Sequence, residues 1–214
     1  MLSKSRISDA ESTILQSRYL LEKVVKSLEI NKQIISISGH TGLKQLEAYN
    51  TAPFAINHPE KADSQYYDQS ISFLVEPIDK NHFELTYGKN ASKSIAINQT
   101  FKVGKNIFNL DVKKNYLKHW LGYKYRIEIS PVSKVVSEIQ SNISINMEKA
   151  ESGVLVISMK GPTPQKNTDI LNKLIEEHQI VTINERNRIA ENTKEFIDTR
   201  IKLIEDQLSQ IEKS

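Results

Sequence analysis

The residues that could act as metal ligands, nucleophiles or general bases are scattered along this sequence. Its five His residues form neither a His-x-His nor a His-x-x-x-His pair, and it contains no Cys. It also lacks the Gly-rich sequences that bind phosphates and the Gly-x-Ser-x-Gly sequence of serine hydrolases. Adjacent carboxylates occur at Glu176-Glu177 and Glu205-Asp206, where a predicted helix favours a solvated face. We therefore expect no enzyme activity, no cofactor and no metal site.

The spacing that stands out is one of apolar side chains near the end of the sequence. They recur alternately four and three residues apart, and we call them the seam: Ile197, Ile201, Ile204, Leu208 and Ile211. Extending the frame backwards through Lys194, Ala190, Asn187, Ile183 and Ile180 gives eight apolar residues in ten positions. This pattern is typical of a coiled coil.

The seam needs a cover, because a lone helix does not keep such an apolar stripe exposed. The cover is the same helix of another copy, or a further segment of the region that folds back. We expect weak, concentration-dependent self-association through it. In the alternative, the seam packs against the β region of its own chain.

One long helix is predicted to carry the seam. Pro164 suits a first turn, and no Gly or Pro follows it, so the helix could span about 75 Å. The β-branched residues around Val181 and Ile183 lower helix propensity and favour a kink there. Because no Gly ends the pattern, we expect the helix to continue in a longer protein.

The remaining pattern predicts an α+β fold. A helix is expected over 9–29, from a capping box at Ser8, and a short helix follows Pro131. Alternation and turn residues predict strands over 33–38, 55–56, 71–75, 82–87, 94–97, 100–103, 107–112, 123–129, 143–147 and 154–159.

These elements predict a division into domains. Residues 1–45 and 131–175 form a split α/β domain, 46–130 an inserted antiparallel β subdomain, and 176–214 a long helix. We expect strands 33–38, 143–147 and 154–159 to share one sheet. The short turn between the last two predicts that they pair antiparallel.

Positive charge is concentrated in the middle of the chain. Residues 77–134 contain 11 Lys and Arg against 4 Asp and Glu, whereas the whole chain carries a net charge of only +3. That total is too small to indicate a nucleic-acid partner. The basic stretch could attract phosphate, anionic lipid or an acidic sugar, or it could be the solvated surface of strands. The sequence contains no run long enough for a membrane span and no leader.

Four segments in order along the chain together resemble a known family. The first contains Leu-x-Ser-Arg-x-x-Leu-x-x-Val-Val, and the second contains Tyr-x-x-x-Pro-Phe. The third is an apolar strand, a Pro-containing loop and a helix with Asn-x-Leu, and the fourth is a Phe-Ile and Arg pattern on the long helix. The matching positions are Ser17, Arg18, Pro53, Phe54, Pro164, Asn172, Leu174, Phe196 and Arg200. The set resembles the Wzz-like polysaccharide co-polymerases, of the larger type associated with tyrosine autokinases.

The resemblance implies the periplasmic region of a bacterial inner-membrane protein. Members have two flanking transmembrane helices, assemble as rings and control the chain length and export of capsular, exo- or O-antigen polysaccharide. It implies as partners other copies of the chain, the polysaccharide polymerase and export machinery, and an acidic polysaccharide. The chain lacks both spans, the Pro/Gly-rich stretch near the second span and any nucleotide-binding motif.

Two other classes of protein share parts of this pattern. A coiled-coil periplasmic adaptor of an efflux or secretion system would need a second long helix antiparallel to the first. A carbohydrate-active enzyme or lectin would need clustered carboxylates beside a cleft, or several exposed aromatic residues, in the β region.

Overall fold

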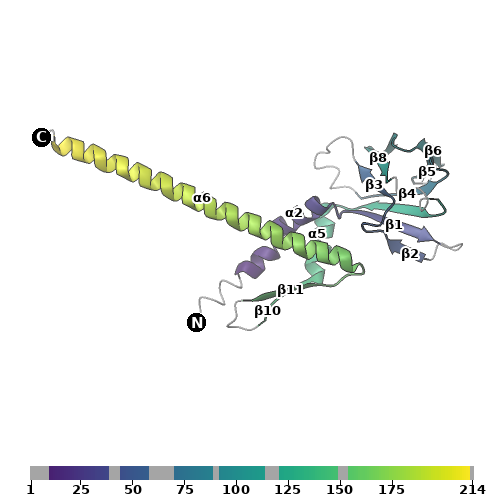
Figure 1. The fold of residues 1–214 in the computed structure, drawn as a ribbon, viewed down its shortest axis with the longest axis horizontal. Coiled ribbons are helices and arrows are strands. Elements are labelled where there is room, and N and C mark those ends of the chain that lie inside the picture. The colour runs from purple at the N-terminus through teal and green to yellow at the C-terminus, as the bar shows by residue number, and fades with distance from the viewer. Residues whose placement is uncertain are drawn as a thin grey trace.

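The computed structural model describes residues 10–38, 44–57, 70–88, 92–113, 121–148 and 154–212. It confirms the α+β class, with antiparallel sheets at one end and a long helix that projects away from them (Figure 1). The helices with full bounds are α2 (Arg18–Leu28), α5 (Val132–Asn142) and α6 (Pro164–Glu212). The strands are β1 (Lys32–Ser38), β2 (Lys44–Glu47), β3 (Phe54–Asn57), β4 (Ile71–Pro77), β5 (His82–Thr86), β6 (Lys93–Ala96), β7 (Thr100–Val103), β8 (Asn106–Val112), β9 (Lys124–Ile129), β10 (Ile143–Met147) and β11 (Leu155–Met159).

The β region contains two antiparallel sheets that share one core. A six-stranded sheet has the order β2-β1-β9-β4-β5-β6, and a three-stranded sheet has the order β3-β8-β7. Their inward side chains meet in one cluster, where Phe73 lies 5.6 Å from Phe108 and 5.9 Å from Phe101 between ring centroids. Burial alternates along β4 and β9, as the period of two in the sequence predicts.

A second core joins the helices to the two-stranded sheet of β10 and β11. Leu21, Val24 and Val25 of α2 lie in one buried cluster with Val136 of α5 and with the start of α6. One face of β10 and β11 packs on this cluster, and the two strands pair antiparallel from Ile143–Met159 to Met147–Leu155, as predicted.

The prediction that strand 33–38 shares a sheet with 143–147 and 154–159 is wrong. This segment is β1, which pairs with β9 on one side and with β2 on the other. Strand β9 pairs with β1 over six residues, from Lys32–Ile129 to Ile37–Lys124, and because this contact is long-range, no local pattern in either strand indicates it. Through this pairing, the segment that follows α2 becomes part of the β region.

The single helix predicted over 9–29 is interrupted. The described helical turns from residue 10 end at Gln16, and α2 begins anew after Ser17, whose hydroxyl accepts a hydrogen bond from the Leu20 backbone N–H at 3.3 Å. Ser is a favoured N-cap residue, so it starts a helix at this point. The predicted capping box at Ser8 lies outside the described residues.

Helix α6 runs without a break from Pro164 to Glu212, through the segment where the sequence favours a kink. In this segment the Thr182 hydroxyl donates a hydrogen bond to the His178 backbone carbonyl at 2.9 Å, so its polar group is satisfied by the helix itself. Within the described part of the chain, no helix is both long and apolar enough to cross a membrane.

Candidate assembly surface

The base of α6 is held in the helical core. Ile170 and Leu174, one turn apart, are 1% and 0% exposed and lie in the cluster that α2 and α5 form. Leu171 and Val181 pack against the same cluster and are partly buried. This contact fixes the direction in which the rest of the helix leaves the body (Figure 1).

Beyond this base the helix stands free of the rest of the described chain. Every side chain from Ile183 to Leu208 is exposed. At 1.5 Å per residue, this stretch is about 38 Å long. Isolated helices are marginally stable in water, so a projecting helix of this length is stabilised when another element covers its apolar side.

The seam lies on this free stretch. Ile197, Ile201, Ile204 and Leu208 are between 48% and 55% exposed, and the Ile211 side chain lies outside the described ones. The alternative in which the seam packs on the β region of its own chain is therefore wrong. The four side chains form an apolar stripe on a surface where nothing described covers them.

A second apolar stripe on α6 was missed by the sequence analysis. It consists of Ile189, Phe196 and Leu203, which are 53%, 69% and 47% exposed. Their spacing of seven residues brings them onto one line, roughly 130° around the helix from the midline of the seam. The sequence signal for it is this repeat of seven, which the four-and-three spacing of the seam concealed. The helix thus presents two apolar stripes.

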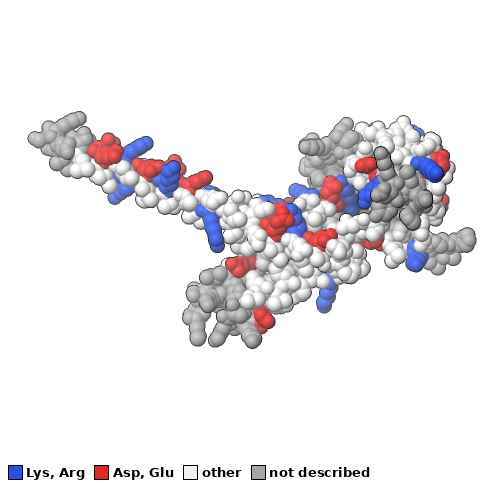
Figure 2. Space-filling model, viewed as in Figure 1, with Lys and Arg blue, Asp and Glu red and all other residues white. Residues whose placement is uncertain are grey.

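The remaining face of the free stretch is charged. Figure 2 shows acidic and basic side chains interspersed along the projecting part of the helix. Arg188 pairs with Glu185 at 2.6 Å, and this hydrogen bond lowers the pKa of the Glu185 carboxyl and raises that of Arg188. Such exposed pairs contribute little to stability, but they mark the side that faces solvent.

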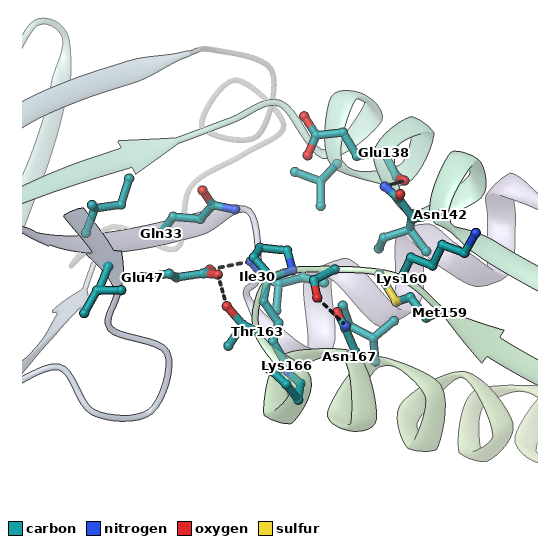
Figure 3. A pocket seen from close by; sticks show the side chains of 18 of the residues that line it. Ile30, Gln33, Glu47, Glu138, Asn142, Met159, Lys160, Thr163, Lys166 and Asn167 are labelled. Carbon is teal, nitrogen blue, oxygen red and sulfur yellow. Dashed lines mark hydrogen bonds and ion pairs between the residues drawn. The ribbon is translucent and has the colours of Figure 1, made fainter. Parts of the chain in front are cut away.

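A groove of about 660 Å³ lies where α6 meets the six-stranded sheet. On one wall, Glu47 of β2 accepts a hydrogen bond from the Thr163 hydroxyl at 2.9 Å and pairs with Lys166 at 2.5 Å (Figure 3). Both members of the ion pair are less than one-fifth exposed. The pair therefore links the edge of the β region to the first turn of α6.

A second link lies close by. The Tyr49 hydroxyl donates to the Asp169 carboxylate at 2.8 Å, and the Asn50 amide donates to the same oxygen at 3.4 Å. Burial, followed by the bond to Asp169, raises the pKa of Tyr49 to about 12, because both disfavour the phenolate. Together, the two links fix α6 against the segment that follows β2.

Replacing Tyr49 by Phe tests this second link. We expect the free energy of unfolding to fall by about 1 kcal/mol at pH 7, because the Asp169 carboxylate loses a donor. A pKa raised by folding stabilises the folded state fully below pH 10, and this contribution disappears as the pH rises toward 12. The deficit of the variant relative to the parent chain should therefore shrink above pH 10 in urea unfolding.

Burial also raises the pKa of Tyr125 to about 12, so parent and variant both lose stability in alkali, and only their difference reports on Tyr49. Tyr87→Phe, at an exposed tyrosine, is the matched control and should behave as the parent does. A Tyr49→Phe deficit that stays constant from pH 7 to pH 11.5 would contradict the assignment.

The residues that carry the family resemblance do not converge on one site. Ser17 caps α2, and Arg18 beside it pairs with Glu22 at 2.8 Å on the surface. Pro53 and Phe54 are buried at the start of β3, and Leu174 is buried in the helical core. The exposed members are Pro164, Asn172, Phe196 and Arg200. Phe196 belongs to the second stripe, and Arg200 lies between the two stripes.

The basic stretch over 77–134 is partly neutralised by neighbouring carboxylates. Lys124 pairs with Glu76 at 2.7 Å, and Arg126 lies 3.7 Å from Glu128. The first pair joins neighbouring strands β9 and β4, and the second lies along β9 itself. Among the residues that the structure describes, no three His, Asp or Glu side chains lie close enough together to hold a metal ion.

No protein-family model matches this chain, and no curated protein matches it either.

Proposed function

We propose that this chain is the periplasmic region of a Wzz-like polysaccharide co-polymerase, and that it acts as a structural and regulatory module rather than an enzyme. The observation that carries the proposal is the free stretch of α6, with the seam and the second stripe both exposed. The four sequence segments that resemble the family support it independently.

The two stripes suit a ring. Each subunit of a ring touches two neighbours through different surfaces, so it needs two contact faces. The seam and the second stripe, whose midlines are roughly 130° apart on one helix, are two such faces. Under this proposal the partners are other copies of the chain and the polysaccharide polymerase and export machinery.

The proposal assigns a role to each part of the chain. The helical core with β10 and β11 forms the membrane-proximal domain, and the two sheets of the β region form the insertion. Strand β1, which the sequence analysis assigned to the 1–45 part of the split domain, belongs to the insertion's sheet. Residues 176–214 belong to the helix through which subunits associate. The adaptor alternative would need a second long helix antiparallel to α6. Among the described residues α2 and α5 are each eleven residues long, so the structure offers no such partner.

Deleting the gene in the source bacterium tests the function. We expect the surface polysaccharide to change from a narrow to a broad or shortened chain-length distribution on a gel, or to be lost from the surface. The intact gene should restore the distribution. A version with Ile201→Asp and Ile204→Asp should not restore it, whereas one with Lys202→Asp, on the charged face and away from both stripes, should. A deletion strain with an unchanged distribution would contradict the proposal.

A further inference from the structure

Charged residues of opposite sign follow the two sides of the seam. On one side lie Glu191, Asp198 and Glu205, seven residues apart, which we call the acidic flank. On the other side lie Arg186 and Arg200, which we call the basic flank. In a heptad frame with Ile201 and Leu208 at position a, the acidic flank occupies position e and the basic flank position g. These positions determine partner choice and orientation in coiled coils.

Both flanks are exposed, and no side chain that the structure describes pairs with them. All five side chains belong to the free stretch of α6. Among the described residues, none of them takes part in a hydrogen bond or an ion pair, in contrast to Arg188 and Glu185 nearby. Their charges are therefore available to another molecule.

The order of the charges distinguishes between two ways of pairing the helix with a second copy. In a parallel pair in register, position g of one helix faces the position e that lies five residues further along its partner. Arg186 then meets Glu191 of the other copy, and Arg200 meets Glu205. In an antiparallel pair, e faces e and g faces g, so acidic flank meets acidic flank. Only the parallel arrangement places opposite charges together.

Two polar residues on the backward extension of the seam bear on the register. Asn187 and Lys194 occupy successive a positions between apolar ones. In register, the two Asn187 side chains can exchange hydrogen bonds, while the long Lys194 side chains direct their like charges outward to solvent. A shift of seven residues would place Lys194 against Ile201, which leaves a charged group against an apolar one. A shifted pair is therefore disfavoured even where the flanks still match.

We propose that copies of this chain associate through α6 as parallel helices in register, with the basic flank of one against the acidic flank of the next. The inference rests on the self-association in the proposed function and adds its orientation and register. In such a pair both flanks are used in the one seam-to-seam contact, and the second stripe of each copy stays exposed for a further neighbour.

Charge reversal tests the orientation. Sedimentation of the full chain should show that Arg186→Glu with Arg200→Glu weakens self-association by at least about tenfold, and that Glu191→Arg with Glu205→Arg does the same. Mixing the two variants should restore association, because one helix is then acidic on both flanks and the other basic. Reversing the Arg188 and Glu185 charges together, on the solvent face, should leave association unchanged.

Cross-linking tests the register. The chain has no Cys, so Ala190→Cys introduces a single thiol at a d position of the seam. A parallel pair in register brings the two thiols together, and the oxidised variant should form a linked dimer at least about tenfold faster than Thr199→Cys, on the charged face.

The outcomes separate this inference from the proposed function. If the chain associates but the charge reversals have no effect, or if Ala190→Cys does not cross-link preferentially, the parallel register is wrong and self-association stands. If the parent chain remains monomeric at every concentration up to the millimolar range, both are wrong.

Discussion

Replacing Ile201 and Ile204 together by Asp is expected to weaken self-association at least about a hundredfold and to leave thermal stability unchanged. Burial of one Ile contributes about 1.5–3 kcal/mol. A contact between two copies loses the Ile201 and Ile204 side chains of both, so the association constant should fall steeply. Both positions are already 48% exposed in the single chain, so the substitutions remove no internal packing. Surface changes of this kind alter the free energy of unfolding by about 0.5 kcal/mol or less.

The measurement is sedimentation over a range of concentrations, together with a thermal unfolding curve at a concentration where the parent chain is monomeric. Lys202→Asp is the matched control, because it changes the net charge by the same two units on the charged face of the same stretch of helix, away from both stripes. It should leave the association constant within about twofold. If instead the Ile201 and Ile204 variant unfolds several kcal/mol more easily, the seam is a core within one chain.

The seam and the strands could be predicted because their signals are local. Alternation of apolar and polar residues over a few positions located β4, β7 and β9 to within two residues. The four-and-three spacing located an apolar stripe whose exposure the structure then showed. In each case, the side chains that make the pattern lie within one element.

The features that were missed depend on contacts between distant segments or on one competing residue. The partner of β1 is β9, about ninety residues further on, and any strand with the right alternation would have suited it equally. The ion pair of Glu47 with Lys166 joins residues 119 positions apart, and no sequence pattern around either residue predicts it. The break before α2 was hidden because the apolar spacing continues across Ser17, while the cap there starts a new helix.

Truncating Leu174 to Ala tests the other end of α6, where the helix is anchored. Leu174 is fully buried in the cluster that contains Ile170 and Val24, so the change leaves a cavity between α6 and its neighbours. Substitutions of this type cost about 2–5 kcal/mol, and we expect about 3 kcal/mol here. The measurement is urea unfolding followed by the helical circular dichroism signal.

Leu203→Ala is the matched control for this anchor. It removes the same atoms from the same helix, but at a site that is 47% exposed, so the free energy of unfolding should change by less than about 0.5 kcal/mol. Self-association should respond in the opposite way. Leu174→Ala leaves the seam and its flanks untouched and should associate as the parent does at temperatures where it is folded. A loss below about 1 kcal/mol for Leu174→Ala would mean that α6 is not held by the helical core, and that the direction of its free stretch is set by the Glu47 and Tyr49 links instead.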